Sequence, residues 1–192
     1  MKAITIKQPF ASLIVEGIKD IENRTWKTNL RGRVLIHAGA KSADFLDSQL
    51  ADHIYDFIRR TSKSGKDWSG YPFSAIIGSV EIVDCVEYHK SIWAEKSIDI
   101  YEQFSLDRHE AIYNWVLANP IKFHEPIPCK GRLSFWESDV EICHICGQPT
   151  SADYECKVCG EYYCDKCAAT YDTFSQIDFN CCSKCQENER SY

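Results

Sequence analysis

Apolar and polar residues alternate at the start of the chain, and the spacing then becomes helical. Residues 3–7, AITIK, alternate and predict a short strand. Pro9 suits the first turn of a helix, the apolar residues of 10–14 share one helical face, and Gly17 provides a stop. The pattern therefore predicts a strand followed directly by a short helix.

The pattern of strands and helices continues through the next hundred residues. Residues 18–26 alternate and lead through the turn NLRGR into the apolar run VLIHA, which predicts a hairpin. Apolar residues at helical spacing predict an amphipathic helix over residues 43–61. A long strand is predicted over 73–88 and a closing strand over 126–136, with a mixed pattern between residues 91 and 119. Strands dominate, so we predict an α+β fold with a mixed or barrel-like sheet.

The strand pattern stops after Trp136 and a cysteine-rich segment begins. Nine of the 11 cysteines lie between Cys143 and Cys185, mostly in C-x-x-C pairs, which indicates metal binding in a reducing compartment rather than disulfides. We therefore predict two domains, residues 1–138 and residues 139–192. No apolar run approaches the roughly 20 residues that span a bilayer, and the N-terminus lacks the apolar core of a signal peptide. The sequence predicts a soluble protein of the cytoplasm, or of the nucleus in a eukaryote, without a membrane partner.

Four cysteine pairs predict two structural zinc sites with four thiolates each, which leave no open position for catalysis. Each C-x-x-C places two sulfurs on one tight turn. A glycine follows two of the pairs and a helix is predicted after the other two, which favours interleaved, cross-braced sites; a sequential arrangement stays open, as does Cys181 in place of Cys182. The predicted ligands are Cys143, Cys146, Cys156, Cys159, Cys164, Cys167, Cys182 and Cys185.

The segment CKVCGEYYCDKC resembles cross-braced treble-clef fingers of the FYVE and RING-like group. Phosphoinositide-binding members carry a basic run where this chain has TSADYE, and RING ligases usually have a histidine ligand, whereas no histidine follows His144 here. The resemblance therefore implies a scaffold, with protein docking or stabilisation as the role of the C-terminal segment.

The formal charge of −6 is unevenly distributed. Residues 1–138 contain 18 basic and 18 acidic residues, and residues 139–192 contain 4 and 10, which accounts for the whole −6. Within residues 1–41, 8 basic residues face 3 acidic ones, giving +5. The acidic total therefore does not exclude a polyanionic ligand at the N-terminal part.

The basic N-terminal part also gathers side chains suited to a nucleotide. On one strand face, Glu22, Arg24 and Trp26 point the same way, and Lys19 and Gln8 lie within reach. Cations neutralise phosphate, a carboxylate accepts from an exocyclic amine, and an indole stacks on a base. The alternative is that Glu22 and Arg24 form a solvated pair worth about 0.2 to 1 kcal/mol and that Trp26 belongs to the core.

The stretch ITIKQPFASLIVEGIKDIENRTWKTNLRGRVLIHAGAK closely resembles the opening of the ASCH domain, including a Gly-x-Lys-x-x-Glu-x-Arg motif at Gly17, Lys19, Glu22 and Arg24. GSVEIVDCVEY and PIPCKGRLSFW are also similar to that family. The resemblance covers roughly residues 1–138. It implies a PUA-like small β-barrel with flanking helices and a cleft that binds RNA or DNA, lined by Gln8, Lys19, Glu22, Arg24, Trp26 and His37. In its apolar strand, His37 by itself is typical of a hydrogen-bonded core histidine.

Three functions remain open from the sequence. The favoured one is a nucleic-acid binding module, with RNA preferred to DNA and a modified base included among the ligands. The second is an enzyme, either an N4-acetylcytidine amidohydrolase or a ribonuclease, with Lys19 and Glu22 as candidate catalytic residues. The related amidohydrolases have a threonine where this chain has Glu22, so the matched position lacks a hydroxyl nucleophile. The third is a protein-interaction adaptor that works through the zinc-binding segment.

Overall fold

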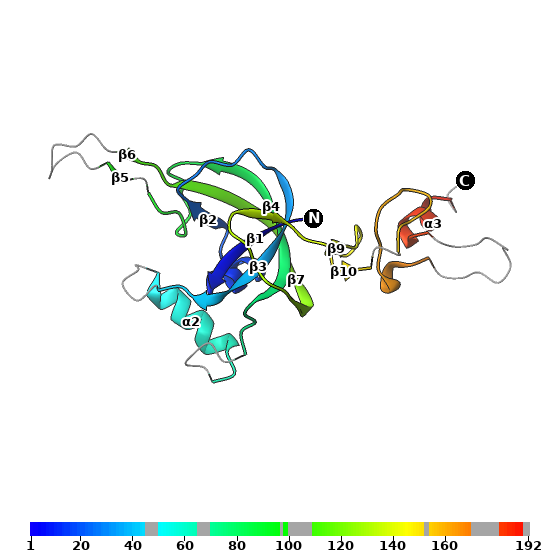
Figure 1. Ribbon diagram of the computed structural model, residues 1–192, viewed down its shortest axis with the longest axis horizontal. Helices are drawn as coiled ribbons and strands as arrows, with labels where there is room; N and C mark the ends of the chain where they lie inside the picture. The colour runs from blue at the N-terminus through cyan, green and yellow to red at the C-terminus, as the bar shows by residue number, and fades with distance from the viewer. Residues whose placement is uncertain are drawn as a thin grey trace. The chain divides into compact units, whose positions relative to one another are not determined.

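The computed structural model describes residues 1–44, 50–64, 70–96, 98–99, 109–151, 154–169 and 181–189. The chain forms two compact units, Lys2–Trp136, and Glu137–Tyr192 together with Met1 (Figure 1). The division falls beside the predicted boundary at residue 138. That each unit is an independent domain stays a prediction.

Strands make up most of the N-terminal unit. Its elements are β1 Lys2–Gln8, α1 Phe10–Val15, β2 Ile21–Arg24, β3 Gly32–Ser42, α2 Ala51–Thr61, β4 Ala75–Val86, β5 Ile98–Asp99, β6 His109–Glu110, β7 Tyr113–Pro128 and β8 Phe135–Glu137, the last residue of which is assigned to the second unit. The C-terminal unit contains β9 Glu141–Ile142, β10 Pro149–Thr150, a 3-10 helix Asp165–Cys167 and α3 Ser183–Glu189.

The main sheet is mixed, as predicted, but it is not closed into a barrel. Its six strands follow the order β2-β7-β4-β3-β1-β8, in which β1 and β3 are parallel and the pairs β3–β4, β4–β7 and β2–β7 are antiparallel. The predicted barrel is wrong because β2 and β8, at the two ends of this order, do not pair. The ends still approach each other, since the rings of Trp26 and Phe135 lie 5.5 Å apart.

The predicted hairpin between residues 18–26 and 34–38 is also wrong. Strand β2 ends at Arg24 and pairs with β7, where Ile21 lies opposite Val116, while β3 pairs with β1 and β4. Similarly, the closing strand predicted over 126–136 is divided into the end of β7 and the short β8 by a loop. Alternation of apolar and polar residues indicates that a segment is extended, but it does not predict which strand pairs with it.

Both predicted helices are present in the described residues. Helix α1 follows Pro9, and Gly17 has φ of 74°, as expected of a residue that ends a helix. Helix α2 confirms the amphipathic pattern, because its apolar residues Ile54, Phe57 and Ile58 are buried. The structure begins α2 at Ala51 rather than at residue 43, and residues 45–49 of the prediction lie outside the described residues.

Two groups of apolar side chains hold this unit together. One joins α1 to strands β1, β3, β4 and β7, and in it fully buried Trp115 meets Trp26 edge-on at 4.5 Å and stacks on Phe135 at 5.1 Å. The other joins Leu13 of α1 to the buried face of α2 and to Trp93. None of the helices in the described part of the chain has the length and apolar character needed to span a bilayer.

Candidate functional site

A cavity of about 640 Å³ opens beside α1, β2 and α2. It borders the second apolar group, which contributes Ile54 and Trp93 to its lining. Its volume lies within the roughly 300–1,000 Å³ that is typical of small-molecule sites. The lining is largely apolar, with a few charged and amide groups. Its residues are Phe10, Lys19, Glu22, Asn23, Leu50, Ile54, Ile92, Trp93, Ala94, Glu95, Lys96 and Ile112.

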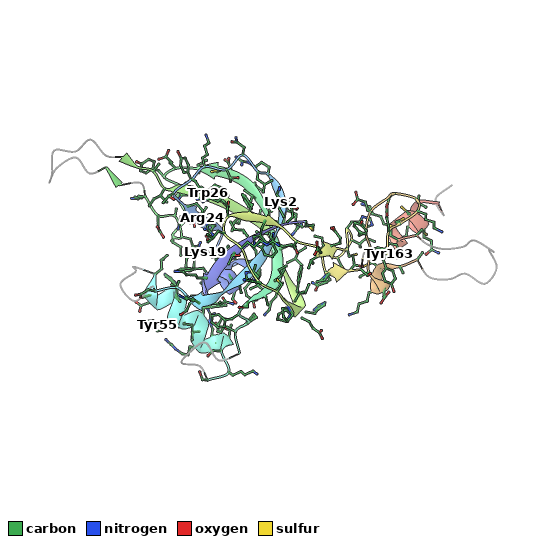
Figure 2. All side chains as sticks on the ribbon, in the orientation of Figure 1. Lys2, Lys19, Arg24, Trp26, Tyr55 and Tyr163 are labelled. Atoms are coloured by element: carbon green, nitrogen blue, oxygen red, sulfur yellow. The ribbon has the colours of Figure 1, made fainter. Side chains whose placement is uncertain are left out.

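A buried ion-pair network adjoins this cavity. Lys19 Nζ lies 3.3 Å from Glu22 Oε2, and Arg24 Nη2 lies 3.0 Å from Glu22 Oε1, with 5%, 11% and 25% of the three side chains exposed. Lys19 also donates to the backbone oxygen of Ile21 and lies 5.5 Å from the centre of the Phe10 ring. Figure 2 shows Lys19 and Arg24 at neighbouring positions on the N-terminal unit. The structure thus brings the three charged motif residues together.

The network retains hydrogen-bonding capacity for a ligand. An ammonium has three donors, and Lys19 uses two of them in the contacts above. Each oxygen of Glu22 accepts from one cation and has a second lone pair. The charged residues of the lining are two cations, Lys19 and Lys96, and two carboxylates, Glu22 and Glu95. Arg24 pairs with Glu22 but is not among the lining residues, so the floor of the cavity offers a donor beside an acceptor, with a further cation behind the acceptor.

A pair of asparagines fixes the wall of the cavity. Asn23 donates to the backbone oxygen of Trp93 at 2.9 Å and accepts from the backbone nitrogen of Glu95 at 3.1 Å. Fully buried Asn114 donates to Asn23 Oδ1 and to Glu95 O, and it accepts from the nitrogen of His89. The sequence pattern did not single out Trp93 and Asn114, because both lie in the segment of mixed pattern between residues 91 and 119. An isolated tryptophan and an isolated asparagine in a segment without periodicity do not by themselves predict a cavity wall.

Gln8 was predicted to line the cleft, but it is not among the residues that line this cavity. It is fully buried, donates to the backbone oxygen of Pro72 at 2.8 Å and accepts from the nitrogen of Ser12 at 3.1 Å. Gln8 therefore ties the first turn of α1 to the segment before β4.

Trp26 and His37 also lie away from the cavity lining. Because β2 ends at Arg24, alternation does not continue to Trp26, whose ring packs against Trp115 and Phe135. His37 is 2% exposed, and its Nε2 lies 3.1 Å from the backbone oxygen of Cys129, so it is a hydrogen-bonded core histidine. Trp93, not Trp26, is the indole of the cavity.

The cysteines form two groups in the interleaved order. Within each group the four sulfurs lie within 4.8 Å of one another; the groups are Cys143, Cys146, Cys164 and Cys167, and Cys156, Cys159, Cys182 and Cys185. A tetrahedral zinc with Zn–S bonds of about 2.3 Å requires sulfurs about 3.8 Å apart. The Sγ–Sγ distances of 3.6 Å between Cys146 and Cys164 and of 4.0 Å between Cys159 and Cys182 agree with this sulfur–sulfur separation.

The backbone around these groups suits thiolate ligands. Gly147 and Gly160 have φ of 70° and 72°, and each donates its N–H to the first cysteine oxygen of its pair at 2.8 Å, which confirms the predicted turns. Burial raises the pKa of Cys156, but hydrogen bonds from the backbone, those of Cys159 and Cys182 foremost, lower it to about 6. These backbone donors therefore stabilise the thiolate of Cys156, the form in which cysteine binds a metal, whereas burial and the neighbouring thiols raise the pKa of Cys167 and Cys185.

Residues 4–127 match the family model of the ASCH domain. The chain belongs to the ASCH domain family. It is 30% and 29% identical over 142 residues to activating signal cointegrator 1 of Homo sapiens and of Mus musculus. These matches cover 72% of this chain and 22% of each relative, so the chain spans about a fifth of the length of these curated relatives.

The chain also has a weak similarity to a solved structure. A crystal structure of ASCH from Zymomonas mobilis matches with a TM-score of 0.42 and 17% identity, over 72% of this chain and 87% of that one. The match of residues 4–127 to the family model confirms the family predicted for the N-terminal part. The cysteine groups lie outside the matched residues 4–127.

Proposed function

We propose that this ASCH protein binds nucleic acid, RNA in preference to DNA, and that one nucleotide base enters the cavity beside β2. The observation that supports it is the buried Lys19–Glu22–Arg24 network next to a cavity of nucleoside size with aromatic walls. Phe10 and Trp93 provide ring surface, which suits any base because every base has a π-face. Lys19 and Glu22 provide a donor and an acceptor for the base edge.

The preference for RNA follows from the shape of the site. A base can enter a cavity of this kind only when it leaves its stack, and proteins recognise splayed, single-stranded bases chiefly in RNA. Arg24 is a quarter exposed and lies beside Glu22, so it is positioned to neutralise the attached phosphate.

In the same proposal, the cysteine groups hold two structural zinc ions. Four thiolates close each tetrahedral site, so the zinc would hold the C-terminal unit together and would not take part in catalysis. The acidic balance of residues 139–192 disfavours phosphate contact. We therefore assign protein docking or stabilisation to this unit.

A second candidate function is an enzyme acting on nucleosides or RNA. Lys19 and Glu22 are buried, 3.3 Å apart and both line the cavity, as expected of a general acid and base. Incubation with N4-acetylcytidine and with RNA in excess chelator tests it. Product formation by the wild type that Glu22→Gln abolishes would favour the enzyme over the binding module.

The binding function is tested by anisotropy titration of fluorescent single-stranded RNA and DNA oligonucleotides. Arg24→Gln is expected to weaken RNA binding about tenfold because it removes a phosphate contact, equivalent to about 1.4 kcal/mol. Arg33→Gln is the matched control: Arg33 is 21% exposed and pairs at 2.9 Å with Glu81, which does not line the cavity, whereas Arg24 pairs with the lining residue Glu22. The proposal fails if a folded Arg24→Gln protein binds RNA as tightly as the wild type.

A further inference from the structure

The loop between β7 and β8, residues 129–134, exposes two cations and an apolar side chain. Lys130 and Arg132 are both exposed, and Leu133 is 95% exposed. No acidic residue occurs between residues 129 and 136. Among the described residues, neither cation has an ion-pair partner.

This loop is held in place by the residues beneath it. Thr5 Oγ1 donates to the backbone oxygen of Arg132 at 2.9 Å and accepts from Trp136 Nε1 at 3.3 Å. Gly131 packs so closely on His37 that an added Cβ would lie 2.4 Å from the imidazole Cε1. His37 in turn meets the ring of Trp136 at 5.8 Å. The exposed side chains therefore project from a fixed backbone.

The conformation of the loop has a free-energy cost. Ser134 has φ of 59°, and a non-glycine residue in this region costs about 1–3 kcal/mol. A single exposed leucine is common on protein surfaces. Leu133, however, directly follows the exposed cation Arg132 and precedes Ser134. A charged and an apolar side chain are thus exposed at consecutive positions, which suits a ligand with charged and apolar parts.

The loop also lies next to the proposed binding site. The backbone oxygen of Thr5 accepts from Arg24 Nη2 at 3.2 Å, while the hydroxyl of Thr5 holds the oxygen of Arg132. One residue of β1 thus connects the guanidinium beside the cavity to the loop. A nucleic-acid strand whose phosphate contacts Arg24 would therefore lie close to the backbone of the loop that carries Lys130 and Arg132.

We propose that loop 129–134 is a second contact surface for the nucleic acid, with Lys130 and Arg132 on successive phosphates and Leu133 against a neighbouring base. This inference rests on the nucleic-acid binding proposed above. Cations without acidic neighbours match a polyanion, and apolar side chains beside cations insert between bases in other nucleic-acid complexes. The loop would thus direct the strand that leaves the cavity.

Single-stranded RNA of about 12 nucleotides tests this surface by anisotropy at several salt concentrations. Lys130→Gln/Arg132→Gln is expected to weaken binding at least tenfold. It should also reduce the slope of log K against log salt by about 1.4, since each phosphate contact contributes about 0.7 with single strands. Leu133→Ser should weaken binding severalfold with an unchanged slope. The control Arg59→Gln/Lys63→Gln removes the same charge from the end of α2 and the residues after it, where Arg59 is 70% exposed.

The outcomes separate this inference from the proposed function. If both loop variants bind as the wild type does while Arg24→Gln weakens binding, the loop surface is refuted and the cavity stands. If the loop variants weaken binding while Arg24→Gln does not, the cavity is refuted and the loop stands. If the Arg59→Gln/Lys63→Gln control loses as much RNA affinity as the loop variant, the effect depends on total charge and not on the loop, and the loop surface is refuted. A wild type that does not bind the RNA overturns both.

Discussion

Glu22 is the residue whose loss has the most readily calculated consequence. Its carboxylate pairs with two cations, Lys19 with 5% and Arg24 with 25% of the side chain exposed. Glu22→Gln keeps the shape of the side chain but leaves the Lys19 ammonium buried without a counter-charge. Removing one partner of a buried pair costs about 3–5 kcal/mol. Arg24 is a quarter exposed and keeps its hydrogen bond to the backbone oxygen of Thr5, so we expect a loss of about 3 kcal/mol, the lower end of that range.

The free energy of unfolding can be measured by urea denaturation followed through tryptophan fluorescence. All five tryptophans precede residue 137, so this signal reports on the N-terminal unit. Glu81→Gln is the matched control, because Glu81 is 33% exposed and pairs with Arg33 at 2.9 Å. For such a partly solvated pair we expect a loss of about 1 kcal/mol or less.

A double variant isolates the pair itself. Lys19→Met/Glu22→Gln removes the buried charge together with its partner, so it should lose at least about 2 kcal/mol less than the sum of the single variants. Equal losses for Glu22→Gln and Glu81→Gln, or additive losses in the double variant, would refute the reasoning, because either result would mean that the Lys19–Glu22 pair is solvated.

Two further substitutions test the sheet and the metal sites. Gly78→Ala should lower the free energy of unfolding by about 1–3 kcal/mol, because the added Cβ would lie 2.3 Å from the backbone oxygen of Ile121; Gly39→Ala, whose nearest contact would be 3.4 Å, should cost less than about 1 kcal/mol in the same urea assay. Cys182→Ser should reduce bound zinc, measured by a colorimetric assay after thiol modification, from two ions per chain to one, whereas Cys181→Ser should retain both. Equal zinc loss in the two variants would contradict the ligand set.

Local chemistry was sufficient where a residue acts on its own neighbours in the chain. Gly17 ends α1 because a glycine readily adopts the positive φ that terminates a helix, whatever lies around it in the fold. The glycines after Cys146 and Cys159 adopt positive φ for the same local reason. The motif spacing placed Lys19, Glu22 and Arg24 together because β2 follows α1 after a short turn. The cysteine spacing likewise predicted two groups of four.

The alternation of apolar and polar residues did not predict which strands pair over long distances in the chain. Alternation through residue 26 could not show that β2 ends at Arg24, nor that its partner is β7. For this reason Trp26 was expected in the cleft, yet it packs on Trp115, and Trp93 from a segment without periodicity lines the cavity. Nor could alternation show whether the sheet closes.

Spacing along the chain thus specified the charged floor of the cavity and the four C-x-x-C pairs, because the residues of each are brought together by a short turn. Which two pairs share a group was decided by the tertiary structure. The walls of the cavity, the open sheet and the partner of each strand depend on which distant segments bury apolar surface against one another. That choice depends on the free energy of the whole folded chain, so only the tertiary structure reveals it.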